Sequence, residues 1–112
     1  MIDMSGVSRV MLYPGVTDMR WGMPGLIAIV GNPEPGTLYV FCGSGGRMLK
    51  MLLVEGDAIS LCCRKLRKRR YLYPASGEPY ATDPENLVAM VRCAALAVLC
   101  ESRGVPSAGM GY

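Results

Sequence analysis

The residues with the clearest chemical potential form one short basic run. Six of the twelve lysine and arginine residues of this 112-residue chain fall within seven consecutive positions. They are Arg64, Lys65, Arg67, Lys68, Arg69 and Arg70. Guanidinium groups offer a fork of donors that matches phosphate oxygens. Because few acidic residues lie nearby in the sequence to neutralise the run, we expect it to bind the phosphates of a nucleic acid.

The surroundings of the run support this expectation. The rest of the chain carries six basic and nine acidic residues, and such asymmetry indicates a polyanionic partner. Tyr71 and Tyr73 follow the run directly, and tyrosine rings stack on exposed bases. Lys50, alone on an otherwise apolar segment, either extends its amine to solvent or faces the same ligand. Two alternatives stay open for the run: a solvated surface without a partner, and contact with an acidic protein.

Groups suited to catalysis or metal binding are sparse. The chain has no histidine, and its five cysteines are odd in number and contain no C-x-x-C pair. We interpret the cysteines as small buried side chains of a protein in a reducing compartment. Asp18, Glu55 and Asp57 define one alternative, a small metal-dependent nuclease-like enzyme, although helix capping and turn formation explain these residues more simply. We therefore predict a protein that is no enzyme and needs no cofactor or metal.

The elements that position the basic run are predicted to form a single α+β domain over residues 1–112. Its core, residues 7–74, is expected to be a small antiparallel β-meander of four to five strands, because the strand-like segments are short and the links between them rich in Gly and Asp. The expected strands are residues 7–13, 37–42, 47–54, 58–66 and 70–73. Residues 67–69 then become the tip of a hairpin.

Two helices complete the predicted domain. A short N-terminal helix either is capped by Thr17 or Asp18 or begins only after Pro24. The sequence Asp83-Pro84-Glu85 is typical of a helix start, and apolar residues continue from it, which predicts a longer C-terminal helix at 83–103 and a loose tail at 104–112. This apolar helix defines a second functional alternative, a protein-interaction module that docks on a partner.

Nothing in the sequence indicates export or membrane insertion. The first five residues lack a basic start and an apolar run, and the longest apolar stretch, residues 87–100, is short and contains Arg92. We expect a cytoplasmic protein that does not contact a membrane.

Several short motifs follow one another in a characteristic order between residues 10 and 74. They are Pro14-Gly15-Val16-Thr17-Asp18-Met19-Arg20, Gly25-Leu26, Leu38-Tyr39-Val40-Phe41, Leu49-Lys50-Met51-Leu52, Gly56-Asp57, Leu61, Arg64-Lys65-Leu66 and Arg70-Tyr71-x-Tyr73-Pro74. In this order they resemble the TnpB accessory proteins of the IS-sixty-six type of bacterial insertion sequence, a second-open-reading-frame-like family.

The resemblance implies a helper encoded beside a transposase, in a family for which no catalytic role is established. It carries the residues Asp18, Arg20, Lys50, Asp57, Arg64, Lys65 and Arg70 over as the candidate site. We therefore predict a non-catalytic accessory protein of transposition that binds DNA, at the element ends or in the transposase–DNA complex. The transposase of the same element is the expected protein partner, and the alternative interaction module would dock on it. The sequence leaves open whether the protein forms a homo-oligomer.

Overall fold

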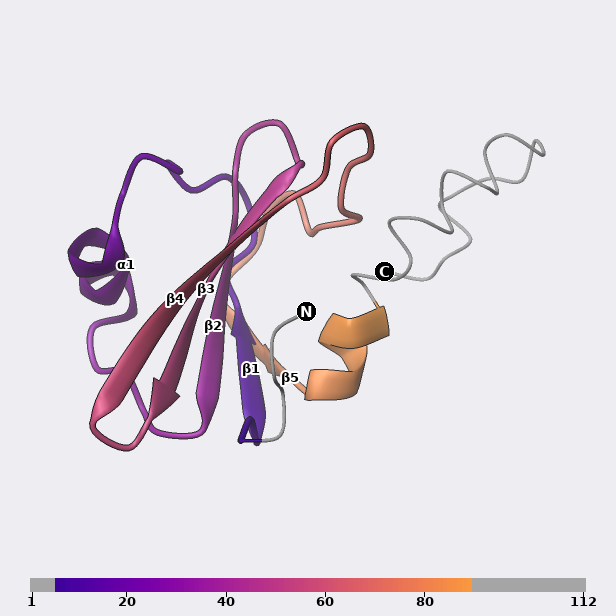
Figure 1. Ribbon diagram of the computed structural model, residues 1–112. Helices are drawn as coiled ribbons and strands as arrows, with labels where there is room; N and C mark the ends of the chain where they lie inside the picture. The colour runs from indigo at the N-terminus through magenta and orange to yellow at the C-terminus, as the bar shows by residue number, and fades with distance from the viewer. Residues whose placement is uncertain (1–5, 90–112) are drawn as a thin grey trace.

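The computed structural model of the protein describes residues 6–89. Five strands form one sheet in the order β4-β3-β2-β1-β5 (Figure 1). Along the chain the elements are β1 (Arg9–Leu12), α1 (Met23–Val30), β2 (Thr37–Cys42), β3 (Met48–Glu55), β4 (Ala58–Lys65) and β5 (Tyr80–Thr82). The α+β class is as predicted.

The sheet is mixed. The three strands β2, β3 and β4 form the predicted antiparallel meander. In contrast, β1 runs parallel to β2, so the prediction of an antiparallel sheet throughout is wrong. The reason is α1, which carries the chain from the end of β1 back to the start of β2 and so makes the two strands run in the same direction.

The first helix, α1, begins at Met23, after the predicted cap residues Thr17 and Asp18. Gly22 precedes α1 and Pro24 lies in its first turn, where the missing N–H of proline costs nothing. Asp18 caps no helix; its carboxylate binds Arg20 instead. The helix ends at Gly31, whose φ of 86° suits glycine and whose N–H donates to the carbonyl of Ile27. Of the two predicted starts, the later one is closer: the helix begins at Met23, just before Pro24 and not after it.

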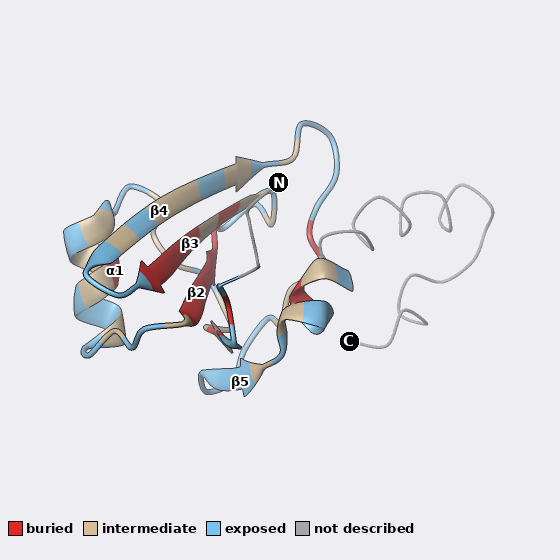
Figure 2. Ribbon diagram, turned by 60° about the horizontal axis from the view of Figure 1, so that its bottom comes forward, coloured by how far each residue is buried: buried red, intermediate tan, exposed pale blue. Residues whose placement is uncertain are grey.

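Each face of the sheet carries its own hydrophobic cluster. Under α1 the cluster consists of Leu26, Tyr39, Phe41, Leu52 and Val54. Burying Leu26, which has no exposed surface, contributes about 1.5–3 kcal/mol and fixes α1 on the sheet. The opposite face packs against residues from the second half of the chain, including Tyr71 and Leu87. The central strands β2 and β3 are accordingly the most buried (Figure 2).

The segment between β4 and β5 crosses the sheet from one edge to the other. The predicted strand at 70–73 is absent, because Tyr71 turns into the core and Tyr73 serves as an anchor. The Tyr73 hydroxyl lies 2.7 Å from the carbonyl oxygen of Tyr13 and 3.0 Å from that of Val40. The chain then adds β5 beside β1. With only three residues, β5 is too short to show a periodic pattern in the sequence.

The predicted start of the C-terminal helix is confirmed. Residues 84–89 are helical, and the N–H of Asn86 donates to Asp83 Oδ1 at 2.8 Å. The first turn packs on the face opposite α1 through Leu87, which is 2% exposed (Figure 1). The remainder of the predicted 83–103 helix and the tail lie outside the described residues. None of the helical segments within residues 6–89 has the length and apolar content that a membrane span requires.

Candidate nucleic-acid interface

The basic run begins on β4 and continues into a loop that is fixed at both ends. The N–H of Leu66 donates to the carbonyl of Arg47 at 2.7 Å, and the N–H of Tyr71 donates to the carbonyl of Gly46 at 2.7 Å. Leu66 also packs against the core, and Tyr71 is part of it. Residues 67–70 therefore form a loop between two core anchors, which replaces the predicted hairpin tip.

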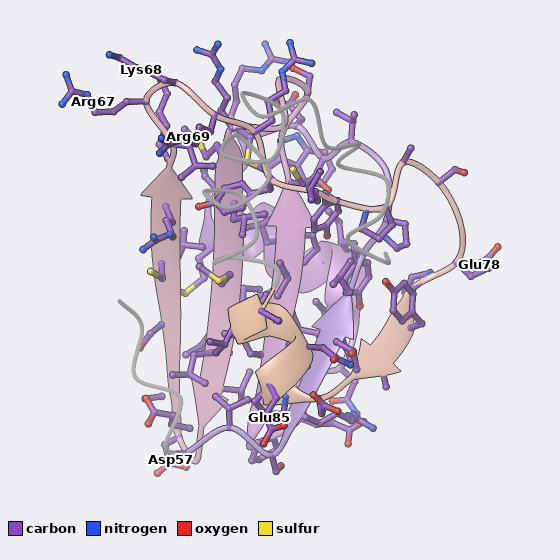
Figure 3. All side chains as sticks on the ribbon, turned by 90° about the vertical axis from the view of Figure 1, so that its right-hand side faces the viewer. Asp57, Arg67, Lys68, Arg69, Glu78 and Glu85 are labelled. Atoms are coloured by element: carbon purple, nitrogen blue, oxygen red, sulfur yellow. The ribbon has the colours of Figure 1, made fainter. Side chains whose placement is uncertain are left out.

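The four side chains of this loop face solvent. Arg67, Lys68, Arg69 and Arg70 are all exposed. Figure 3 shows the first three projecting beyond the sheet at the end where β4 finishes. Lys65, Leu66 and the next three residues line an open groove of about 410 Å³. Since hydrophobic neighbours hold the backbone while the charged groups extend outward, the loop presents its donors without burying them.

The turn between β2 and β3 adds a further arginine that sequence reasoning missed. Arg47 is exposed and belongs to the same turn as Gly46, on which the Arg70 side chain packs. Gly46 has a φ of 71°, a backbone conformation that residues with a side chain rarely adopt, so glycine is needed at this point of the turn. No local signal identifies Arg47, because 20 residues of sequence separate it from Arg67 and only the β3–β4 pairing brings them together.

Arg64 differs from the other members of the run. It is partly buried on the face of the sheet that carries Tyr71, and its Nε is buried without a hydrogen-bond partner among the described residues. Burial raises the pKa of the Tyr71 hydroxyl, and the nearby Arg64 charge partly opposes that rise. Arg64 therefore contributes its charge from beneath the surface.

Among the described residues, no acidic side chain forms a salt bridge with the run. Residues 6–89 contain two salt bridges, Arg9–Glu34 and Arg20–Asp18, and neither involves residues 64–70. Most described acids lie at the other end of the sheet, where β3 ends and β4 begins; Figure 3 shows Asp57 and Glu85 there. We call this the acidic end, formed by Glu34, Glu55, Asp57, Asp83 and Glu85. The basic end consists of Arg47, Arg64, Lys65, Arg67, Lys68, Arg69 and Arg70.

Arg20 and Lys50 lie near the basic end but are engaged within the protein. Two nitrogens of the Arg20 guanidinium bond the Asp18 carboxylate, with Nη2 2.7 Å from Oδ2, and these hydrogen bonds lower the pKa of Asp18 to about 2. The Lys50 amine donates to the carbonyl of Trp21 at 2.9 Å. Arg20 also lines a second open groove, of about 680 Å³, that reaches Met48. This groove adjoins the first, because Met48 pairs with Lys65 across β3 and β4.

The two tyrosines proposed to stack on bases point inward. Tyr71 is 4% exposed and Tyr73 is partly buried, with its hydroxyl bound to two backbone carbonyls. Burial raises the pKa of both hydroxyls. Tyr71 is too buried to stack on a base, which corrects the role predicted for it, and the Tyr73 hydroxyl is committed to two backbone carbonyls beside the sheet.

The three acids of the nuclease alternative are not assembled into a site. Asp18 lies beside the second groove near the basic end, whereas Glu55 and Asp57 flank the β3–β4 turn at the acidic end. Within residues 6–89, no three side chains of the metal-binding types come together. The correction follows from topology, because an antiparallel pair puts its turn at one end of the sheet and its open ends at the other.

The protein is thus a small α+β domain whose mixed sheet carries opposite charges at its two ends. Comparison with known families shows that the family described as "IS66 Orf2 like protein" matches residues 8–100. The chain belongs to this family, and the match extends well beyond the motifs at 10–74. A protein of Sinorhizobium fredii, described as uncharacterized, is 36% identical over 85 residues, which cover 70% of this chain and 74% of that protein. No solved structure matches the chain. The family places the protein among those associated with insertion sequences.

Proposed function

We propose that the protein is a non-catalytic accessory factor of insertion-sequence transposition that binds DNA through its basic end. The observation that carries the proposal is the grouping of Arg47 with residues 64–70 at one end of the sheet, without a salt bridge to any described carboxylate. Phosphates supply the missing negative charge, and arginine forks match their oxygens. The transposase–DNA complex, or the element ends alone, is the proposed target.

The geometry supports phosphate contact more than base reading. The exposed members of the basic end are arginines and lysines, while Tyr71 and Tyr73 are committed to internal packing. Contacts to phosphate fix position and affinity but carry little sequence information. In this proposal the transposase therefore supplies the sequence specificity for the element, and the protein raises the affinity of the complex for DNA.

A salt titration of DNA binding tests the proposal. Six exposed cations, namely Arg47, Lys65, Arg67, Lys68, Arg69 and Arg70, predict a slope of about −5 for log K against log salt on duplex DNA. Replacing Arg67, Lys68 and Arg69 by Ala is expected to reduce the magnitude of the slope by about 3. Binding that is undetectable at low salt, or a slope unchanged by the triple variant, would refute DNA binding at this site.

The interaction-module alternative receives less support from the described residues. The first turn of its helix uses Leu87 to pack on the sheet of the protein itself. Its apolar residues from position 90 onward lie outside the described residues. DNA binding by the basic end is therefore the function that the structure favours.

A further inference from the structure

The strand β4 forms one edge of the sheet, and its charged residues, Arg64 and Lys65, are confined to its C-terminal end. It pairs with β3 over all eight of its residues, and among the described elements no strand pairs with its outer side. It contains no proline and its pairing has no bulge, since the register runs without interruption from Glu55–Ala58 to Met48–Lys65. Proteins ordinarily protect a long, regular edge with prolines, bulges, charged side chains or covering segments, because it is a template for another strand. On β4 the six residues from Ala58 to Cys63 have none of these among the described residues.

The register shows which backbone groups of β4 face outward. In an antiparallel pair, residues alternate between those that bond the neighbouring strand and those that point away from it. The N–H of Leu66 bonds the carbonyl of Arg47, which continues the β3–β4 register by one position. Even-numbered residues therefore bond β3, and the N–H and C=O groups of Ile59, Leu61, Cys63 and Lys65 point outward.

A second copy of the chain fits this edge in one symmetric register. A two-fold axis perpendicular to the sheet makes two β4 strands antiparallel and keeps α1 of both copies on the same side. With the axis at Leu61, the outward groups of Ile59 face those of Cys63 from the second copy. The pairing then places Leu61 against Leu61, Ser60 against Cys62, and Ala58 against Arg64. No like charges lie directly opposite one another.

The charges at the two ends of β4 complement each other in this register. Asp57, in the turn before β4, comes to lie across from Lys65 of the second copy, and the symmetry creates this pair twice. Both side chains are exposed in the single chain, where neither forms a salt bridge with a described residue. Opposite charges on facing positions stabilise a strand pair, and like charges destabilise it.

We propose that the protein forms a homodimer through antiparallel pairing of β4 with β4, centred on Leu61. The two sheets become one, and the two Lys65 positions lie about 26 Å apart along the strands, from a rise of 3.3 Å per residue. The loops at 67–70 lie beyond the end of β4 at Lys65 and so outside the strand pairing. The dimer is argued from the edge and its register, and of the basic end it engages only Arg64 and Lys65, so dimerisation and DNA binding are measured by separate experiments.

Sedimentation equilibrium of the full chain tests the dimer. Cys63→Pro removes the outward N–H of Cys63 and leaves the β3–β4 ladder intact, since that group does not bond β3. Cys63→Ala is the matched control. Two lost hydrogen bonds per dimer predict a dissociation constant raised roughly thirtyfold for the proline variant, while the alanine variant behaves as the original chain. A chain that is monomeric at high micromolar concentration, or a folded proline variant that dimerises unchanged, would overturn the proposal.

A charge exchange provides a test that does not depend on proline. Asp57→Lys and Lys65→Asp each place like charges opposite one another twice, which predicts a several-fold weaker dimer. Combining both changes in one chain restores opposite charges and is expected to restore the original dissociation constant. Failure of the combined variant to recover would show that these residues do not face each other. Because Cys63→Pro changes no residue of the basic end, DNA binding by that monomer is measured separately and tests the proposed function alone.

Discussion

The two ends of the sheet carry opposite charges. At the acidic end, Gly56 and Asp57 close a two-residue turn between β3 and β4, and the nearby Arg9 is paired with Glu34. At the basic end, β4 opens into a loop whose cations have no described carboxylate partner. The difference teaches that the sheet keeps apart two groups of charge that the sequence supplies. A chain with a net charge of only +3 therefore has a basic end and an acidic end.

The largest expected effect comes from reversing one charge at each end. Arg69→Glu is expected to weaken DNA binding on the order of fiftyfold at moderate salt, because it removes one phosphate contact and adds a repulsive charge. Arg9→Glu makes the same change in net charge at the acidic end and should cost little affinity. Electrophoretic mobility or fluorescence anisotropy assays measure both variants. Equal losses would show that only the net charge matters and would remove the distinction between the ends.

The next effect concerns the tyrosine that holds the basic loop. Tyr73→Phe deletes a hydroxyl bound to the carbonyls of Tyr13 and Val40, and we expect the free energy of unfolding to fall by about 1–3 kcal/mol. Tyr80→Phe changes the same group on an exposed residue and is expected to alter stability by less than about 0.5 kcal/mol. Urea denaturation followed by circular dichroism compares the two variants. Similar values for both would mean that the crossing segment is not anchored by Tyr73.

A pair of glycines compares the turns at the two ends. Gly46 and Gly56 have φ values of 71° and 55°, and an alanine at either position is expected to cost about 1–2 kcal/mol of stability. Only Gly46→Ala should also reduce DNA affinity, because the Gly46 carbonyl accepts the N–H of Tyr71 at the end of the basic loop. Thermal unfolding and binding assays on both variants separate these effects. A loss of DNA affinity in Gly56→Ala would contradict the assignment of the site to one end.

The smallest effect is a titration beside the second groove. Hydrogen bonds from Arg20 lower the pKa of Asp18 to about 2, so the pair stabilises the fold above the ordinary carboxyl pKa and this contribution is lost as the pH falls from about 4 through 2. NMR titration of the carboxyl group measures the pKa directly. Arg20→Gln is expected to return it toward the ordinary value of 3.8. An unchanged pKa in that variant would show that the two side chains are not paired in solution.

Local patterns in the sequence predicted much of the sheet. The segments 37–42, 47–54 and 58–66 correspond within one residue to β2, β3 and β4, because β-branched and aromatic runs between Gly- and Asp-containing turns report strands directly. The helix start at Asp83 was equally readable, since capping depends on neighbouring residues. The segment at 70–73 was predicted as a strand for the same local reason. Instead, Tyr71 packs in the core and the Tyr73 hydroxyl donates to two distant backbone carbonyls.

The sequence by itself determined the basic run, the family and the strands that carry the run. Charge content, short motifs and alternating side chains are local properties, so they can be identified without knowing how distant segments pack. Only the tertiary structure decided that Arg47 joins the run, that Tyr71 and Tyr73 turn inward, and that Asp18 is separated from Asp57. Each of these depends on pairing between distant segments, because strand register and the crossing of the chain over the sheet fix which side chains meet.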